Sequence, residues 1–132
     1  MTIANRVENY NSTMAKLDSF AGLKEGWDLG RGEKIATKAI DKAKDLIKYA
    51  YGHKLGNSMD VIPTPSGCVL VIFKLGPAFP TLDIEVYIDE SGHYELTVSD
   101  YHDHIDGFAR HAVKNSPLFN TMQDYIENAN KT

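Results

Sequence analysis

The feature that most constrains the fold is a run of six consecutive apolar residues from Cys68 to Phe73. A strand that is apolar at every position needs cover on both faces, so we expect this run to be an interior strand of a sheet. The preceding Thr64-Pro65-Ser66-Gly67 has turn chemistry, because Pro presets φ at the second position and Gly accepts the left-handed conformation that follows. The sequence therefore predicts a hairpin with arms at 59–63 and 68–73.

This hairpin distributes its side chains over two faces. The opposed pairs are Met59–Phe73 and Val61–Val71 on one face, and Ile62–Leu70 and Asp60–Ile72 on the other. The first face is apolar, and the second carries three aliphatic residues beside an aspartate.

A second hairpin is predicted for 81–89 and 92–100. A type I turn over Asp89-Glu90-Ser91-Gly92, with Gly as the left-handed bulge residue, sets its register. Each apolar residue then faces another, in the pairs Ile84–Val98, Val86–Leu96 and Ile88–Tyr94. A one-residue slip would mix the two faces, so this register is well specified.

Two helices are expected before the hairpins, at 3–21 and 34–51. The first has an apolar seam of Ile3, Val7, Tyr10, Met14, Leu17 and Ala21. The second has an apolar arc of Ile35, Ala36, Ala39, Ile40, Ala43, Leu46, Ile47 and Ala50. We predict one α+β domain over residues 1–132: a four-stranded antiparallel meander packed on these helices, with a short C-terminal helix at 117–128.

Charge and composition exclude some functions. The net charge is −4, which argues against nucleic-acid binding driven by phosphate neutralisation. The lysines of 34–51 are interleaved with aspartates, so we interpret that side of the helix as a solvated face. The single cysteine, Cys68, is expected to be a small buried residue in a reducing compartment. No stretch has the length of a signal peptide core or a membrane span, so we expect a soluble, cytoplasmic protein.

The chain resembles a loose group of small bacterial and phage proteins. The resemblance covers residues 17–99 and rests on Leu23-Lys-Glu-Gly-Trp-Asp28, on an Ala-rich helix, and on Val61-Ile-Pro-Thr-Pro-Ser-Gly67 before an apolar strand. Proteins of this group share a Gly-Trp-Asp/Asn loop and a Pro-Thr-Pro-x-Gly hairpin. The resemblance implies a fold and a mobile-element origin, without active residues. In many of these sequences a small residue and another Gly follow Trp-Asp, whereas this chain has Leu29-Gly30-Arg31-Gly32.

The second face of the sheet is the predicted functional surface. Helices on one side of the sheet leave it uncovered, and soluble monomers rarely expose a large contiguous apolar patch. We predict a protein-binding site of Ile62, Leu70, Ile72, Asp83, Glu85 and Tyr87. The expected occupant is another protein or a second copy in a homodimer, and the C-terminal helix is the alternative. The function that follows is a non-enzymatic binding module, such as an antitoxin or a phage-encoded inhibitor.

A different function depends on the histidines and aspartates of 100–111. Asp100, His102, Asp103, His104, Asp106 and His111 have the ligand types of zinc, manganese or iron sites, which would suit a small metal-dependent hydrolase or nuclease. A bare His-x-His run lacks the spacing of a helical metal motif, so we expect a polar loop, with no catalytic residue, metal or cofactor. A third hypothesis places Trp27 in a ligand pocket, against the interpretation that it caps the edge of the core.

Overall fold

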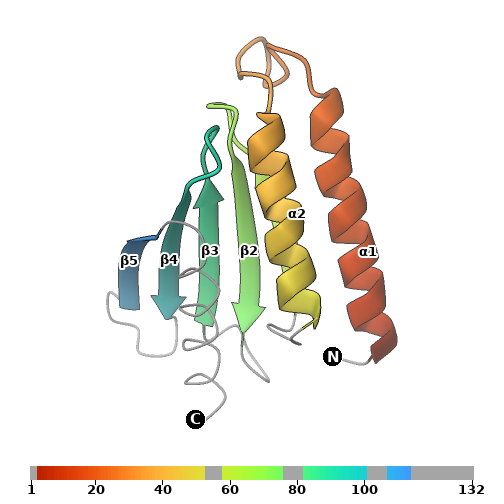
Figure 1. Ribbon diagram of the computed structural model, residues 1–132, viewed down its shortest axis with the longest axis vertical. Coiled ribbons are helices and arrows are strands. Elements are labelled where there is room, and N and C mark those ends of the chain that lie inside the picture. The colour runs from red at the N-terminus through yellow and green to blue at the C-terminus, as the bar shows by residue number, and fades with distance from the viewer. Residues whose placement is uncertain (1–2, 53–57, 76–81, 101–106, 114–132) are drawn as a thin grey trace.

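The computed structural model describes residues 3–52, 58–75, 82–100 and 107–113, and it confirms an α+β architecture (Figure 1). Helix α1 (Ile3–Ser19) ends in a short 3₁₀ turn, η1 (Phe20–Gly22), and a loop leads to helix α2 (Thr37–Gly52). The strands follow in the order β1 (Ser58–Pro63), β2 (Val69–Leu75), β3 (Leu82–Ile88), β4 (Tyr94–Asp100) and β5 (Gly107–Val113).

The sheet is an antiparallel meander in which each strand pairs with the next along the chain. Both predicted registers are confirmed, including Val61 opposite Val71 and Val86 opposite Leu96. Turn chemistry fixes the first of them: Gly67 has a φ of +83°, and its N–H donates to the Thr64 carbonyl at 3.0 Å. The apolar run forms β2, which pairs on both edges as expected of an interior strand.

The sheet has a fifth strand that the sequence analysis did not predict. β5 pairs with β4 along its whole length, from Asp100 opposite Gly107 to Tyr94 opposite Val113. Its sequence, Gly-Phe-Ala-Arg-His-Ala-Val, contains one β-branched residue and no regular apolar alternation, so the signals used for the other strands are absent. The C-terminal helix predicted at 117–128 lies outside the described residues.

Helix α2 carries most of the helical contribution to the core. Its predicted arc is buried: Ala39, Ile40, Ala43, Leu46, Ile47 and Ala50. They pack against the face of the sheet that carries Val69, Val71, Phe73, Ile84, Val86 and Ile88. The helix begins three residues later than predicted, because Glu33 and Ala36 donate their N–H groups to Pro65 and Gly67 of the hairpin turn.

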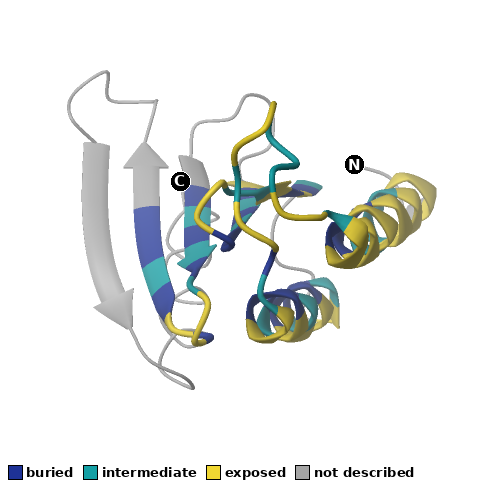
Figure 2. Ribbon diagram, turned by 90° about the horizontal axis from the view of Figure 1, so that it is seen from above, coloured by how far each residue is buried: buried dark blue, intermediate teal, exposed yellow. Residues whose placement is uncertain are grey.

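Helix α1 lies beside α2 and along β1, on the same side of the sheet (Figures 1 and 2). Its predicted apolar seam is wrong in part, since Val7 is 39% exposed and Ala21 is exposed. The buried residues of this segment are Thr13, Leu17 and Phe20. The seam is narrower than predicted because α1 meets the sheet at a strand edge, where polar backbone groups as well as apolar side chains need partners.

Candidate functional site

Cross-strand pairing brings the predicted binding residues together on the face opposite the helices. Ile62, Leu70 and Tyr87 form one row across β1, β2 and β3, which continues to Glu95 on β4. In the next row, Ile72 and Glu85 lie between Asp60 and Thr97. In the third row Asp83 pairs with Lys74. We call the face formed by Ile62, Leu70, Ile72, Glu85, Tyr87, Glu95 and Thr97 the outer face.

The outer face is less buried than the face beneath the helices. Along β2, Val69, Val71 and Phe73 are fully buried, whereas Leu70 and Ile72 are half-buried. Ile62 is 39% exposed. Figure 2 shows the same alternation along the described part of β3, whereas on β4 Glu95 is half-buried and Thr97 is buried. The described side chains of this face thus combine accessible aliphatic surface with charged neighbours.

A shallow depression of about 270 Å³ lies on the outer face. Its lining residues are Leu70, Glu85, Tyr87, Glu95 and Thr97. Glu95 and Thr97 were not among the predicted binding residues. The signal for them was present in the register, because Glu95 pairs with Tyr87 and Thr97 with Glu85.

One carboxylate at the border of the outer face has a basic partner. Lys16 of α1 donates to Asp60 Oδ1 at 2.9 Å, so the carboxylate at the β1 edge already has a counter-charge. The carboxylates that line the depression are those of Glu85 and Glu95.

Tyr87 is held by the hairpin turn at one end of the outer face. Its hydroxyl lies 3.1 Å from Ser66 Oγ, which in turn lies 2.9 Å from Thr64 Oγ1. The neighbouring Cys68 thiol and partial burial raise the pKa of the Tyr87 hydroxyl. The raised pKa favours the neutral form of the hydroxyl, which has a proton to donate in a hydrogen bond. Cys68 is buried, as predicted.

Trp27 belongs to a tightly bonded loop and packs against the edge of the core. Its Nε1–H donates to the Glu33 carbonyl at 2.7 Å, and a Cβ on Gly32 would lie 2.9 Å from the same nitrogen. This supports the interpretation of Trp27 as a cap on the core. At the loop tip, Asp28 and Arg31 form a two-residue turn around Leu29 and Gly30, both with positive φ. Leu29 is 99% exposed there.

The histidine and aspartate segment falls largely outside the described part of the chain. Asp100 is the last residue of β4, and His111 lies on β5 opposite Leu96. His102, Asp103, His104 and Asp106 lie outside the described residues. Within the described ranges, no group of three or more His, Cys, Asp or Glu side chains is placed to hold a metal ion.

Comparison of the chain with protein-family models, with curated proteins and with solved structures finds no match. Among the described helices, none combines the length and the apolar character that crossing a membrane requires.

Proposed function

We propose that this chain is a non-enzymatic protein-binding module, of the antitoxin or phage-inhibitor kind, that binds its partner through the outer face. The observation that carries the proposal is the row of Ile62, Leu70 and Tyr87 with Ile72 beside it, on the side of the sheet away from both helices. Contiguous aliphatic side chains at neighbouring strand positions form the apolar centre that protein interfaces use.

The chemistry of the face supports a partner of a particular kind. Its apolar centre lies beside the carboxylates of Glu85 and Glu95, and the Tyr87 hydroxyl is fixed at one end. A partner with an apolar patch and basic residues on one flank would match it in both respects. By register, Asp83 lies at a position of the same face, opposite Lys74.

The test is a double variant, Leu70→Glu with Ile72→Glu. Both residues are half-buried, so we expect the melting temperature to fall by less than about 5 °C, which corresponds to roughly 1 kcal/mol in a domain of this size. Capture of a host protein by the tagged wild-type chain, or its self-assembly measured by solution mass, should be lost. The matched control, Ala15→Glu with Ala21→Glu, adds the same charge at two exposed positions of the helical segment and should retain binding.

Two outcomes would contradict this function. Failure of the Leu70/Ile72 variant to fold would show that the outer face belongs to the protein's own core. A purified chain that contains stoichiometric zinc, manganese or iron, and that loses more than about 5 °C of melting temperature on chelation, would favour the metal-dependent hydrolase.

A further inference from the structure

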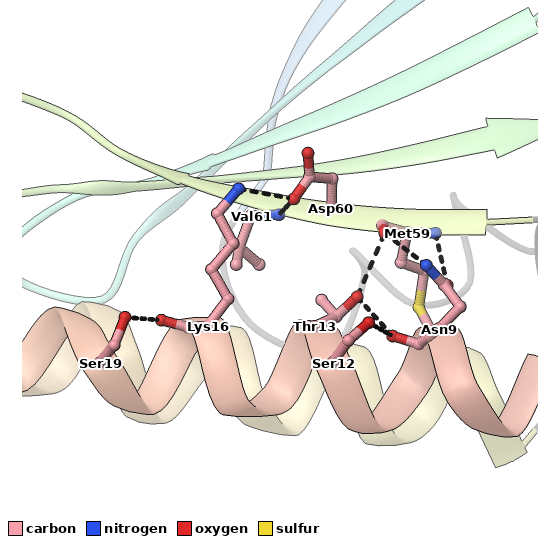
Figure 3. A network of polar contacts seen from close by, with 8 residues as sticks. All are labelled: Asn9, Ser12, Thr13, Lys16, Ser19, Met59, Asp60 and Val61. Carbon is pink, nitrogen blue, oxygen red and sulfur yellow. Dashed lines mark hydrogen bonds and ion pairs between the residues drawn. The ribbon is translucent and has the colours of Figure 1, made fainter.

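Strand β1 is an edge of the sheet, and its free side is occupied by side chains of α1. Edge strands present unpaired N–H and C=O groups, which readily accept another strand. In β1 these groups are on Met59 and Val61, whose N–H groups bond side chains instead of β2. Figure 3 shows the contacts that cover them.

The Asn9 side chain replaces a neighbouring strand at Met59. The Met59 N–H donates to Asn9 Oδ1 at 2.9 Å, and Asn9 Nδ2 donates to the Met59 carbonyl at 3.1 Å. These are the two hydrogen bonds that a residue of an antiparallel strand would make with Met59. The Thr13 hydroxyl, which is buried, shares its one proton between the Asn9 carbonyl at 2.7 Å and the Met59 carbonyl at 3.2 Å.

The rest of the edge is covered in a similar way. The Val61 N–H donates to Asp60 Oδ1 at 2.8 Å, and Lys16 holds the same carboxylate oxygen at 2.9 Å. The next outward position is Pro63, which has no N–H to donate. Each outward-facing donor of β1 from Met59 to Pro63 is thus bonded to a side chain or absent.

The backbone of another strand could replace these contacts of α1 with β1. Within α1 itself, Thr13 and Leu17 are the buried residues among those described. A groove of about 330 Å³ lies along the junction of α1 and β1, and its lining is polar except for Met59: Asn9, Ser12, Thr13, Lys16, Ser58, Met59, Asp60 and Lys74. An extended strand could supply the same backbone hydrogen bonds without loss of the β1–β2 ladder.

We propose that the β1 edge is a second interaction surface, guarded by α1, and that the strand it accepts is β1 of another copy of this chain. An antiparallel pairing centred on Val61 places the two Val61 residues opposite each other, so that their N–H and C=O groups exchange hydrogen bonds. Met59 then lies opposite Pro63 of the second copy, and its N–H has that carbonyl as a partner. The proposal is independent of the outer face.

The same register explains why a second copy fits. Asp60 lies opposite Ile62 of the second copy, so no like charges meet directly across the pair. Alternation places Met59 and Val61 of both strands on the helix side, which continues the apolar inner face across the junction. A two-fold pairing of identical strands also closes on itself and leaves no further copy to add.

The test compares Asn9→Ala with Ser12→Ala by sedimentation equilibrium. Asn9→Ala removes the competitor for Met59, so self-association should tighten by at least about tenfold relative to the wild type, since two hydrogen bonds of ordinary net strength no longer compete. Ser12 donates to the Asn9 carbonyl within the helix, and its removal should leave self-association unchanged. Asn9→Asp keeps the acceptor for the Met59 N–H and loses the donor, so it should fall between the wild type and Asn9→Ala.

A combined variant distinguishes assembly through the β1 edge from assembly through the outer face. If assembly runs through the edge, Asn9→Ala with Leu70→Glu should associate as tightly as Asn9→Ala alone. Loss of association in the combined variant would overturn the edge proposal and support the outer face as the surface of assembly. An Asn9→Ala protein that remains folded, exchanges its Met59 amide faster and yet associates no more tightly than the wild type would also overturn it.

Discussion

The two helices attach to the same sheet through different chemistry. Helix α2 buries a continuous apolar arc that includes Ala43, Leu46 and Ile47. Helix α1 buries Leu17, while Asn9, Thr13 and Lys16 bond to β1 through polar atoms. Towards α2, α1 adds a stacked pair of rings, Tyr10 and Tyr51, with centroids 4.2 Å apart, and an ion pair from Asp18 to Lys44.

This difference separates a permanent contact from a replaceable one. Each buried Leu or Ile of α2 contributes about 1.5–3 kcal/mol, and that contribution depends on staying in the core. A hydrogen bond of the α1–β1 kind contributes about 0.5–1.5 kcal/mol net, and another backbone can supply the same bond. The comparison predicts that variants in α2 affect the stability of the whole domain, whereas variants in the α1–β1 network act mainly on the edge.

The largest effect is expected from Leu46→Ala. Leu46 is fully buried between α2 and the sheet, so truncation leaves a cavity and should lower the free energy of unfolding by about 2–5 kcal/mol. Urea denaturation measures this difference, with Lys48→Ala on the exposed side of the same helix as the control. A loss below about 1 kcal/mol would mean that α2 is not the main apolar attachment.

Asn9→Ala should have a smaller effect on stability. It removes both hydrogen bonds to Met59, but the adjoining groove admits water to the freed groups, so we expect a loss of about 1–2 kcal/mol. Amides of α2, which exchange through global unfolding, should become faster only by the factor that corresponds to this loss, whereas the Met59 amide, which loses its own hydrogen-bond partner, should accelerate more. Equal acceleration at Met59 and in α2 would remove the distinction between the two attachments.

The loop that joins the helices contains a residue whose replacement should stabilise the protein. Leu29 has a φ of +52°, which is unfavourable for a residue with a Cβ atom. Its side chain is 99% exposed, so burial does not offset this strain. Leu29→Asn should raise the free energy of unfolding by about 1 kcal/mol, because Asn tolerates the left-handed region. Thermal denaturation measures the gain. A fall in melting temperature would show that Leu29 makes a contact that outweighs the strain.

The ion pair between Lys44 and Asp18 should contribute least to the free energy of unfolding. The hydrogen bond to Asp18 raises the pKa of Lys44 above its usual 10.5. The stabilisation is therefore complete below that pH and is lost as the pH rises through the raised pKa. Both groups are solvent-accessible, so Lys44→Gln should lower the free energy of unfolding by less than about 1 kcal/mol at pH 7. Urea curves at pH 7 and 11 provide the check: the variant should differ from the wild type less at pH 11, and a larger difference there would contradict the assignment.

Apolar pattern and turn chemistry were sufficient to predict the sheet register, the arc of α2 and the residues that share the outer face. They could not predict the attachment of α1. Asn9 and Lys16 are ordinary polar residues of a helix, and no local pattern shows that their partners are Met59 and Asp60, 50 and 44 residues away. The strand β5 was missed because its residues carry weak strand signals and its pairing with β4 is what places it in the sheet.

Native-state hydrogen exchange of the wild-type chain, followed residue by residue at low denaturant concentrations, tests the central comparison most directly. The account predicts that α1 amides from Val7 to Lys16 exchange through local opening, with a free energy below that of global unfolding and little dependence on denaturant. Amides of α2 around Ala43 and Leu46 should exchange only through global unfolding. If the amides of both helices exchanged with the same free energy and the same denaturant dependence, α1 would be as firmly built into the fold as α2. The β1 edge would then not be available to another strand.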